Sequence, residues 1–153
     1  MTAEERELRG RLSELAATDD GRRLLQLALR GIDRGEQQLT AGCWTQHGVA
    51  GCLFQHAYWQ GVREGVFADR GRPGDWIGSL VGSRGYGTVI DAIGAFDRLA
   101  RRHHADRRRR PLLPDRVVVR TGEWRETVGR ILVETLAEGG ALPARNPAPA
   151  SAV

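Results

Sequence analysis

The chain of 153 residues contains no lysine, because all 23 of its Lys and Arg residues are arginine. This absence excludes lysine Schiff-base chemistry, a lysine-linked cofactor and a standard Walker A phosphate loop. Cysteine is also scarce, and two residues are too few for a disulfide scaffold. The amino terminus shows no apolar signal segment behind a basic stub, so we expect a cytoplasmic protein with reduced thiols.

Charge is missing from one long stretch, the 26 positions from Gln37 to Val62. The composition of the whole chain, 41% hydrophobic and 27% charged, is typical of a folded globular chain of one domain. The uncharged stretch contains five glutamines and two histidines, which are costly in hydrocarbon and argue against a membrane span. It therefore predicts the buried centre of the protein.

Apolar residues recur at helical spacing along most of the chain. They predict an all-α fold, a single compact domain of five or six helices over residues 1–139. A capping box of Thr2 and Glu5 marks the start of the first helix. The expected segments are helices over 3–17, 21–39 and 49–67, a helical turn over 75–81, a glycine-rich bend, a helix from Thr88 to the arginine tract, and a last helix from Trp124 to Gly139.

Two segments are expected to be non-helical. Residues 116–120 contain the three β-branched residues Val117, Val118 and Val119 and follow two prolines, which favours a short strand or a plain extended connection. Residues 140–153 are rich in proline and alanine without periodicity, and we expect a disordered tail there.

Both cysteines and two of the four histidines fall within fourteen residues, as a doubled C-x3-H pattern. Residues four apart on a helix share a face, so each pair offers one sulfur and one imidazole nitrogen to the same ion. Thiolate and neutral imidazole are donors that zinc prefers, and two such pairs make a tetrahedral site. The pattern predicts a Cys2His2 zinc site of Cys43, His47, Cys52 and His56. The alternative is four ordinary buried side chains, because the spacing matches no usual zinc-finger pattern.

A second interpretation uses Cys52 and His56 alone as a catalytic pair. On a helix they form a narrow stripe with Trp59 and Arg63, opposite the apolar face, and a thiol in the first turn is activated by the helix dipole. The segments GVAGCLFQHAY and RPGDWI resemble the nucleophile helix and following strand of papain-like cell-wall amidases. That family needs a histidine on a strand after the second segment, whereas here the next histidines, His103 and His104, fall at the end of a predicted helix beside the arginines.

Residues 101–110 concentrate the positive charge, with six arginines against one aspartate, while the rest of the chain has 17 arginines against 18 acidic residues. Such a tract suits phosphate contacts with a polyanion, but it has no aromatic residues to read bases. The alternative is a solvated helix end. The candidate contact residues are Arg101, Arg102, Arg107, Arg108, Arg109 and Arg110. The skeleton of a phosphate loop at residues 82–88 lacks its lysine, which excludes nucleotide hydrolysis.

The motif Trp44-Thr45-Gln46, followed by Gly51-Cys52-Leu53 and Ala57, resembles a family of small uncharacterised proteins from actinobacteria and their phages. The resemblance covers about residues 20–67, with a shorter gap between the two motifs and with Gln55 where a glycine is usual. It implies a small helical cytoplasmic domain and no catalytic residue.

Together these features predict a non-enzymatic binding or regulatory module, stabilised by zinc, whose partner is another protein or a second copy of the chain. The alternatives are a cysteine-dependent hydrolase or transferase using Cys52 and His56, and a weak polyanion-binding protein using the arginine tract. No membrane is expected among the partners.

Overall fold

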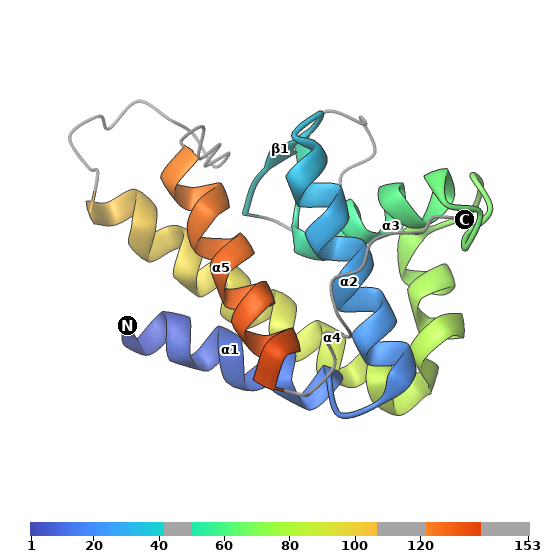
Figure 1. Ribbon diagram of the computed structural model, residues 1–153, viewed down its shortest axis with the longest axis horizontal. Helices are drawn as coiled ribbons and strands as arrows, with labels where there is room; N and C mark the ends of the chain where they lie inside the picture. The colour runs from blue at the N-terminus through green and yellow to red at the C-terminus, as the bar shows by residue number, and fades with distance from the viewer. Residues whose placement is uncertain (42–49, 107–121, 139–153) are drawn as a thin grey trace.

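A computed structural model describes residues 1–41, 50–106 and 122–138, and it confirms the all-α fold. Within these ranges the chain forms five helices and one pair of short strands (Figure 1). In chain order the elements are α1 (Ala3–Leu15), α2 (Asp19–Arg34), β1 (Gln38–Leu39), β2 (Ala50–Gly51), α3 (Leu53–Arg63), α4 (Pro73–Asp106) and α5 (Gly122–Glu138). The expected extended segment at 116–120 and the expected tail at 140–153 lie outside the described residues.

The first two helices begin at side-chain caps. The capping box of α1 is present, because the Thr2 hydroxyl accepts from the Glu5 amide at 3.1 Å and the Glu5 carboxylate accepts from the Thr2 amide at 3.3 Å. Thr18 caps α2 by accepting from the Gly21 amide at 3.0 Å. These bonds satisfy amides that have no partner inside the helix, so they fix where each helix begins.

Strand pairing moves the boundaries of the second and third helices away from those that the sequence predicts. α2 stops at Arg34 rather than at residue 39, because Gly35 takes the left-handed conformation at φ 72° and the chain then enters β1. β1 pairs with β2 in parallel register, with Gln38 opposite Ala50. For that reason α3 begins only at Leu53 instead of at Val49.

Gly82 divides α4 into two helical segments. Its backbone, at φ 79° and ψ 172°, interrupts an otherwise helical run from Pro73 to Asp106. The sequence predicts a break in this region, but it places a whole glycine-rich bend before Thr88. In the structure one glycine makes the break, and the Thr88 hydroxyl donates to the Arg84 carbonyl inside the helix at 3.4 Å instead of capping a new one.

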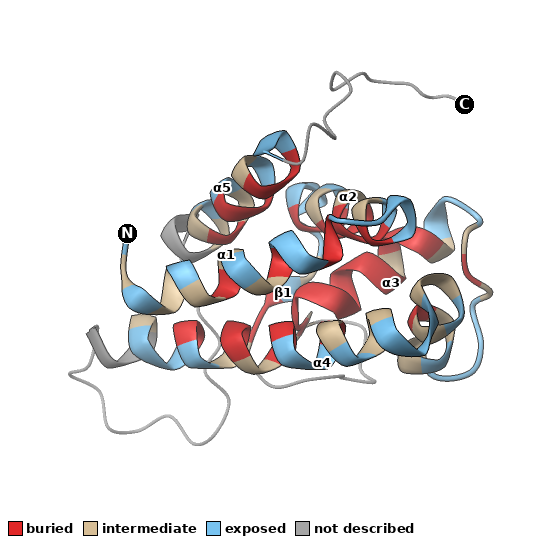
Figure 2. Ribbon diagram, turned by 90° about the horizontal axis from the view of Figure 1, so that it is seen from below, coloured by how far each residue is buried: buried red, intermediate tan, exposed pale blue. Residues whose placement is uncertain are grey.

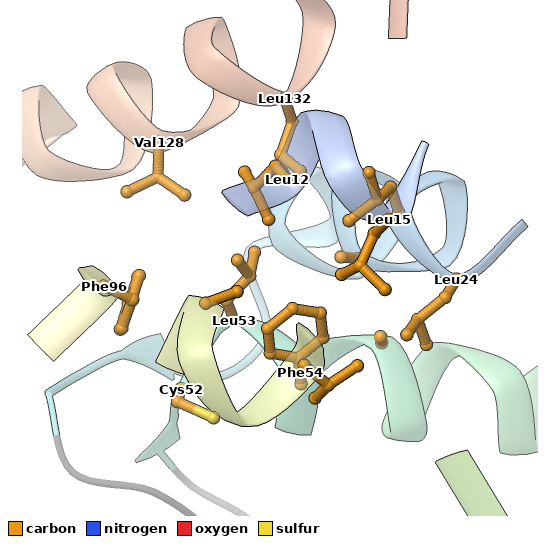
Figure 3. Close-up of a cluster of buried hydrophobic side chains, with 14 of the residues drawn as sticks. Leu12, Leu15, Leu24, Cys52, Leu53, Phe54, Phe96, Val128 and Leu132 are labelled. Atoms are coloured by element: carbon orange, nitrogen blue, oxygen red, sulfur yellow. The ribbon is translucent and has the colours of Figure 1, made fainter. Parts of the chain in front are cut away.

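α3 is the central helix of the molecule. It lies between α2 and α4, and its surface is buried along most of its length (Figure 2). Leu53 and Phe54 enter a cluster of apolar side chains from every other helix, and Cys52 lies at an edge of this cluster (Figure 3). The uncharged stretch of the sequence thus contributes the centre of the core, as predicted. In the part of the chain that the structure describes, no helix has the length and apolar character to cross a membrane.

Candidate functional site

Cys52 and His56 lie in the first turn of α3, just after β2. Cys52 is the N-cap residue of this helix, in an extended conformation, and its thiol makes no capping hydrogen bond. The side chain of Cys52 has no exposed surface, and His56 is 1% exposed. Two of the four side chains in the doubled C-x3-H pattern are therefore buried on one turn of helix.

Both ring nitrogens of His56 are directed at backbone carbonyl oxygens. Nδ1 lies 2.9 Å from the Cys52 oxygen, and Nε2 lies 3.4 Å from the Gln37 oxygen. A neutral imidazole carries one N–H group, which donates in the shorter of the two contacts, so Nδ1 is the donor. The lone pair of Nε2 then faces the Gln37 oxygen, and an oxygen cannot donate to it.

The Gln37 oxygen already has a strong donor. Arg125 of α5 donates to it through Nη2 at 2.7 Å. A carbonyl oxygen accepts two hydrogen bonds, so the bond from Arg125 leaves a second lone pair on this oxygen. The Gln37 oxygen lies in the direction in which Nε2 would bind a ligand, so a metal ion on Nε2 requires this carbonyl to move aside.

The surroundings of His56 favour its neutral form. Burial lowers the pKa of His56, and the guanidinium groups of Arg125 and Arg63 lower it further, although the two carbonyl contacts act in the opposite direction. The ring also meets Trp59 edge to face, with centroids 5.2 Å apart. A neutral, fixed imidazole with Nδ1–H on a backbone carbonyl is the arrangement that metal-binding histidines commonly have.

The stripe of Cys52, His56, Trp59 and Arg63 is buried at Cys52 and His56, half-buried at Trp59 and exposed at Arg63. Arg63 donates to the Glu36 carboxylate at 2.7 Å, and His56 meets the carbonyl of Gln37, so the chain between α2 and β1 lies along the stripe. At β2 the fit is so close that a Cβ on Gly51 would lie 3.0 Å from the Trp59 ring. Packing therefore covers Cys52 and His56, the two residues that the catalytic interpretation uses.

The other two predicted zinc ligands, Cys43 and His47, lie outside the described residues. Among the residues with described positions, no group of three or more His, Cys, Asp or Glu side chains is placed to hold a metal ion. Of the four predicted zinc ligands, the structure therefore describes two, Cys52 and His56. The strands β1 and β2 fix the chain on either side of the segment that carries the other two.

The arginine tract contributes two side chains to the described part of the protein. Arg101 is exposed, whereas Arg102 forms an ion pair with Glu4 of α1 at 3.5 Å. One turn earlier, Arg98 makes a two-pronged contact with Glu7, at 3.0 Å and 2.5 Å. These contacts join α4 to α1, and they neutralise part of the charge that a polyanion would use. Residues 107–110 lie outside the described residues.

Two residues that contact this region, Gln37 and Arg125, could not be identified from any pattern in the sequence. Gln37 takes part through its backbone oxygen, which any residue provides. Arg125 lies 88 positions away in the chain and is one of 23 arginines. Only the packing of α5 against α2 brings its guanidinium to the stem of β1.

Comparison of this chain with protein-family models, with curated proteins and with solved structures finds no match.

Proposed function

We propose that this protein is a small non-enzymatic binding or regulatory module, in which zinc bound by Cys43, His47, Cys52 and His56 stabilises the fold. In this proposal the two C-x3-H pairs are structural ligands. Bound zinc would tie the start of α3 to the segment between β1 and β2.

One observation supports the proposal most, the placement of Cys52 and His56 on one buried turn at the start of α3, immediately after β2. The ring of His56 is held by Nδ1–H on the Cys52 carbonyl, so Nε2 is the nitrogen that would bind zinc once the Gln37 carbonyl moves aside. The neutral state of the ring, which burial favours, is the state that binds a metal.

The two alternatives receive less support from the same contacts. A cysteine nucleophile needs an accessible thiol and a histidine free to exchange its proton. Cys52 has no exposed surface, and both nitrogens of His56 face carbonyl oxygens. Binding of a polyanion would draw on Arg102, which is paired with Glu4, and on arginines outside the described residues.

Elemental analysis of the purified full chain tests the proposal. We expect about one equivalent of zinc, and we expect a chelator to lower the midpoint of thermal unfolding, because metal binding is coupled to folding. The control is a double variant, Cys43→Ser with His47→Asn, which keeps the Cys52–His56 turn and should contain no zinc. Less than half an equivalent in the unaltered protein, together with no effect of chelator, refutes the zinc site.

Thiol alkylation distinguishes the proposed non-enzymatic module from the alternative in which Cys52 is a catalytic nucleophile. We expect Cys52 in the folded protein to react with iodoacetamide more slowly than a free model thiol at neutral pH, because it is buried. Peptide mass mapping distinguishes its product from that of Cys43. If Cys52 reacts faster than the model thiol, the nucleophile interpretation replaces this proposal.

A further inference from the structure

Arg125 connects α5 to the short chain that links α2 with β1. Its Nη1 donates to the Ile32 carbonyl in the last turn of α2, and its Nη2 donates to the Gln37 carbonyl at 2.7 Å. Both acceptors are backbone atoms, and they are five residues apart. A single guanidinium group therefore spans the end of one helix and the start of a strand.

The chemistry of arginine suits this position. The guanidinium is planar and presents its donors in a fixed fork, so the two contacts also fix the distance between the two carbonyls. Its positive charge lies near the carboxyl end of α2, where the helix dipole favours cations. The guanidinium lies beside the turn at Gly35, whose φ of 72° ends α2.

β1 has few backbone hydrogen bonds of its own. It consists of two residues paired with two residues of β2, and the Thr40 amide adds one bond to the Gly51 carbonyl at 3.0 Å. Its Leu39 side chain is buried in the core, as are Val128, Ile131 and Leu132 of α5. Arg125 therefore adds a polar link between two elements that share the core.

We propose that the Arg125 fork couples the packing of α5 to the β1–β2 pair, so that the position of α5 in the core determines how firmly the strand pair before α3 is held. This coupling uses only protein groups, so it does not depend on bound zinc.

Hydrogen exchange of the Thr40 amide, followed by NMR in the full chain, tests the coupling. In Arg125→Gln we expect this amide to exchange about tenfold faster, the loss expected for one hydrogen bond to a charged group. Amides in the middle of α1 and of α4 should exchange at the rate of the unaltered protein. Arg130→Gln is the matched control, because it removes from the same helix a guanidinium that forms ion pairs with Glu5 and Glu134.

Two results overturn the coupling. One is an unchanged rate at Thr40 in Arg125→Gln, and the other is an equal increase at Thr40 in both variants. If Arg125→Gln does not fold, Arg125→Lys keeps the charge but loses the fork, and the same two outcomes apply to it. We would also measure the zinc content of each variant. A failure of the coupling would then be distinguished from a failure of the zinc site, because the coupling does not depend on zinc.

Discussion

At the scale of single residues, the start of α3 is defined by tight contacts to backbone atoms. His56 uses Nδ1 on the carbonyl of Cys52, and Gly31 of α2 lies against the carbonyl of the same histidine. The histidine is thus held by its ring on one side and by its backbone on the other. Small changes next to it should have large effects on stability.

Gly31 gives the most direct test of that closeness. A Cβ at this position would lie 2.5 Å from the His56 carbonyl oxygen, so Gly31→Ala must push α2 and α3 apart. We expect a loss of about 1–3 kcal/mol in the free energy of unfolding, measured by urea denaturation. The control is Gly10→Ala in α1, where no atom lies within 4 Å and alanine should stabilise the helix by about 0.5–1 kcal/mol.

A gain of stability in both alanine variants would contradict the close approach of Gly31 in α2 to the His56 carbonyl in α3. The sequence does not predict this contact. Gly31 falls on the apolar face of the second predicted helix, but no pattern shows that its missing side chain makes room for the backbone of another helix.

At the scale of elements, helix boundaries follow from a few backbone conformations. The capping box at Thr2 and the break before Thr88 are visible in the sequence, because cap residues and glycine have strong local preferences. The start of α3 is not visible, because it depends on the pairing of Gln38 with Ala50, twelve positions away. Local patterns thus predict the helices well, and they predict least where distant segments pair.

The kink in α4 depends on Gly82. Its φ of 79° with ψ of 172° belongs to a region that only glycine adopts readily, so Gly82→Ala should cost about 1–3 kcal/mol of stability. Gly87→Ala is the control in the same element, since this glycine is helical and no atom lies within 4 Å. We expect the control to gain about 0.5–1 kcal/mol by urea denaturation. Equal effects of the two changes would show that the kink does not need glycine.

The contact of Glu7 with Arg98 predicts a pH dependence. The hydrogen bond from Arg98 lowers the pKa of Glu7 below its ordinary value of 4.5. As the pH falls below 4.5, the unfolded chain takes up this proton before the folded one, so the contribution to stability exists at higher pH and is lost on acidification. The thermal midpoint of Glu7→Gln should lie slightly below that of the unaltered protein at pH 6, and the two should converge near pH 3.

The measurement is a series of thermal unfolding curves between pH 3 and pH 7. Glu14→Gln, at an exposed position of the same helix, controls for the loss of one negative charge from α1. A difference between Glu7→Gln and the unaltered protein that grew on acidification would contradict the assignment.

At the scale of the whole molecule, the distribution of charge predicts the architecture. The uncharged stretch contains nearly all of α3 and the strands β1 and β2 that precede it. The surrounding helices are joined by ion pairs, such as those that Arg98 and Arg102 of α4 form with α1. The sequence predicts the helical class and the buried centre for this reason. It could not predict the position of Arg125 or the carbonyl of Gln37, because both depend on tertiary packing.

The same limit applies to the candidate site. Spacing brings Cys52 and His56 onto one turn of helix, as predicted, but it does not show that the chain after α2 covers them. The direction of the imidazole follows from two carbonyls in different elements. A bound zinc ion remains our proposal, and it is the central claim about function.

X-ray absorption at the zinc edge of the purified, unaltered protein tests that claim most directly. The proposal predicts a four-coordinate ion with two sulfur ligands at about 2.3 Å and two nitrogen ligands at about 2.0 Å. A spectrum without sulfur ligands, or a protein preparation without zinc, would contradict it.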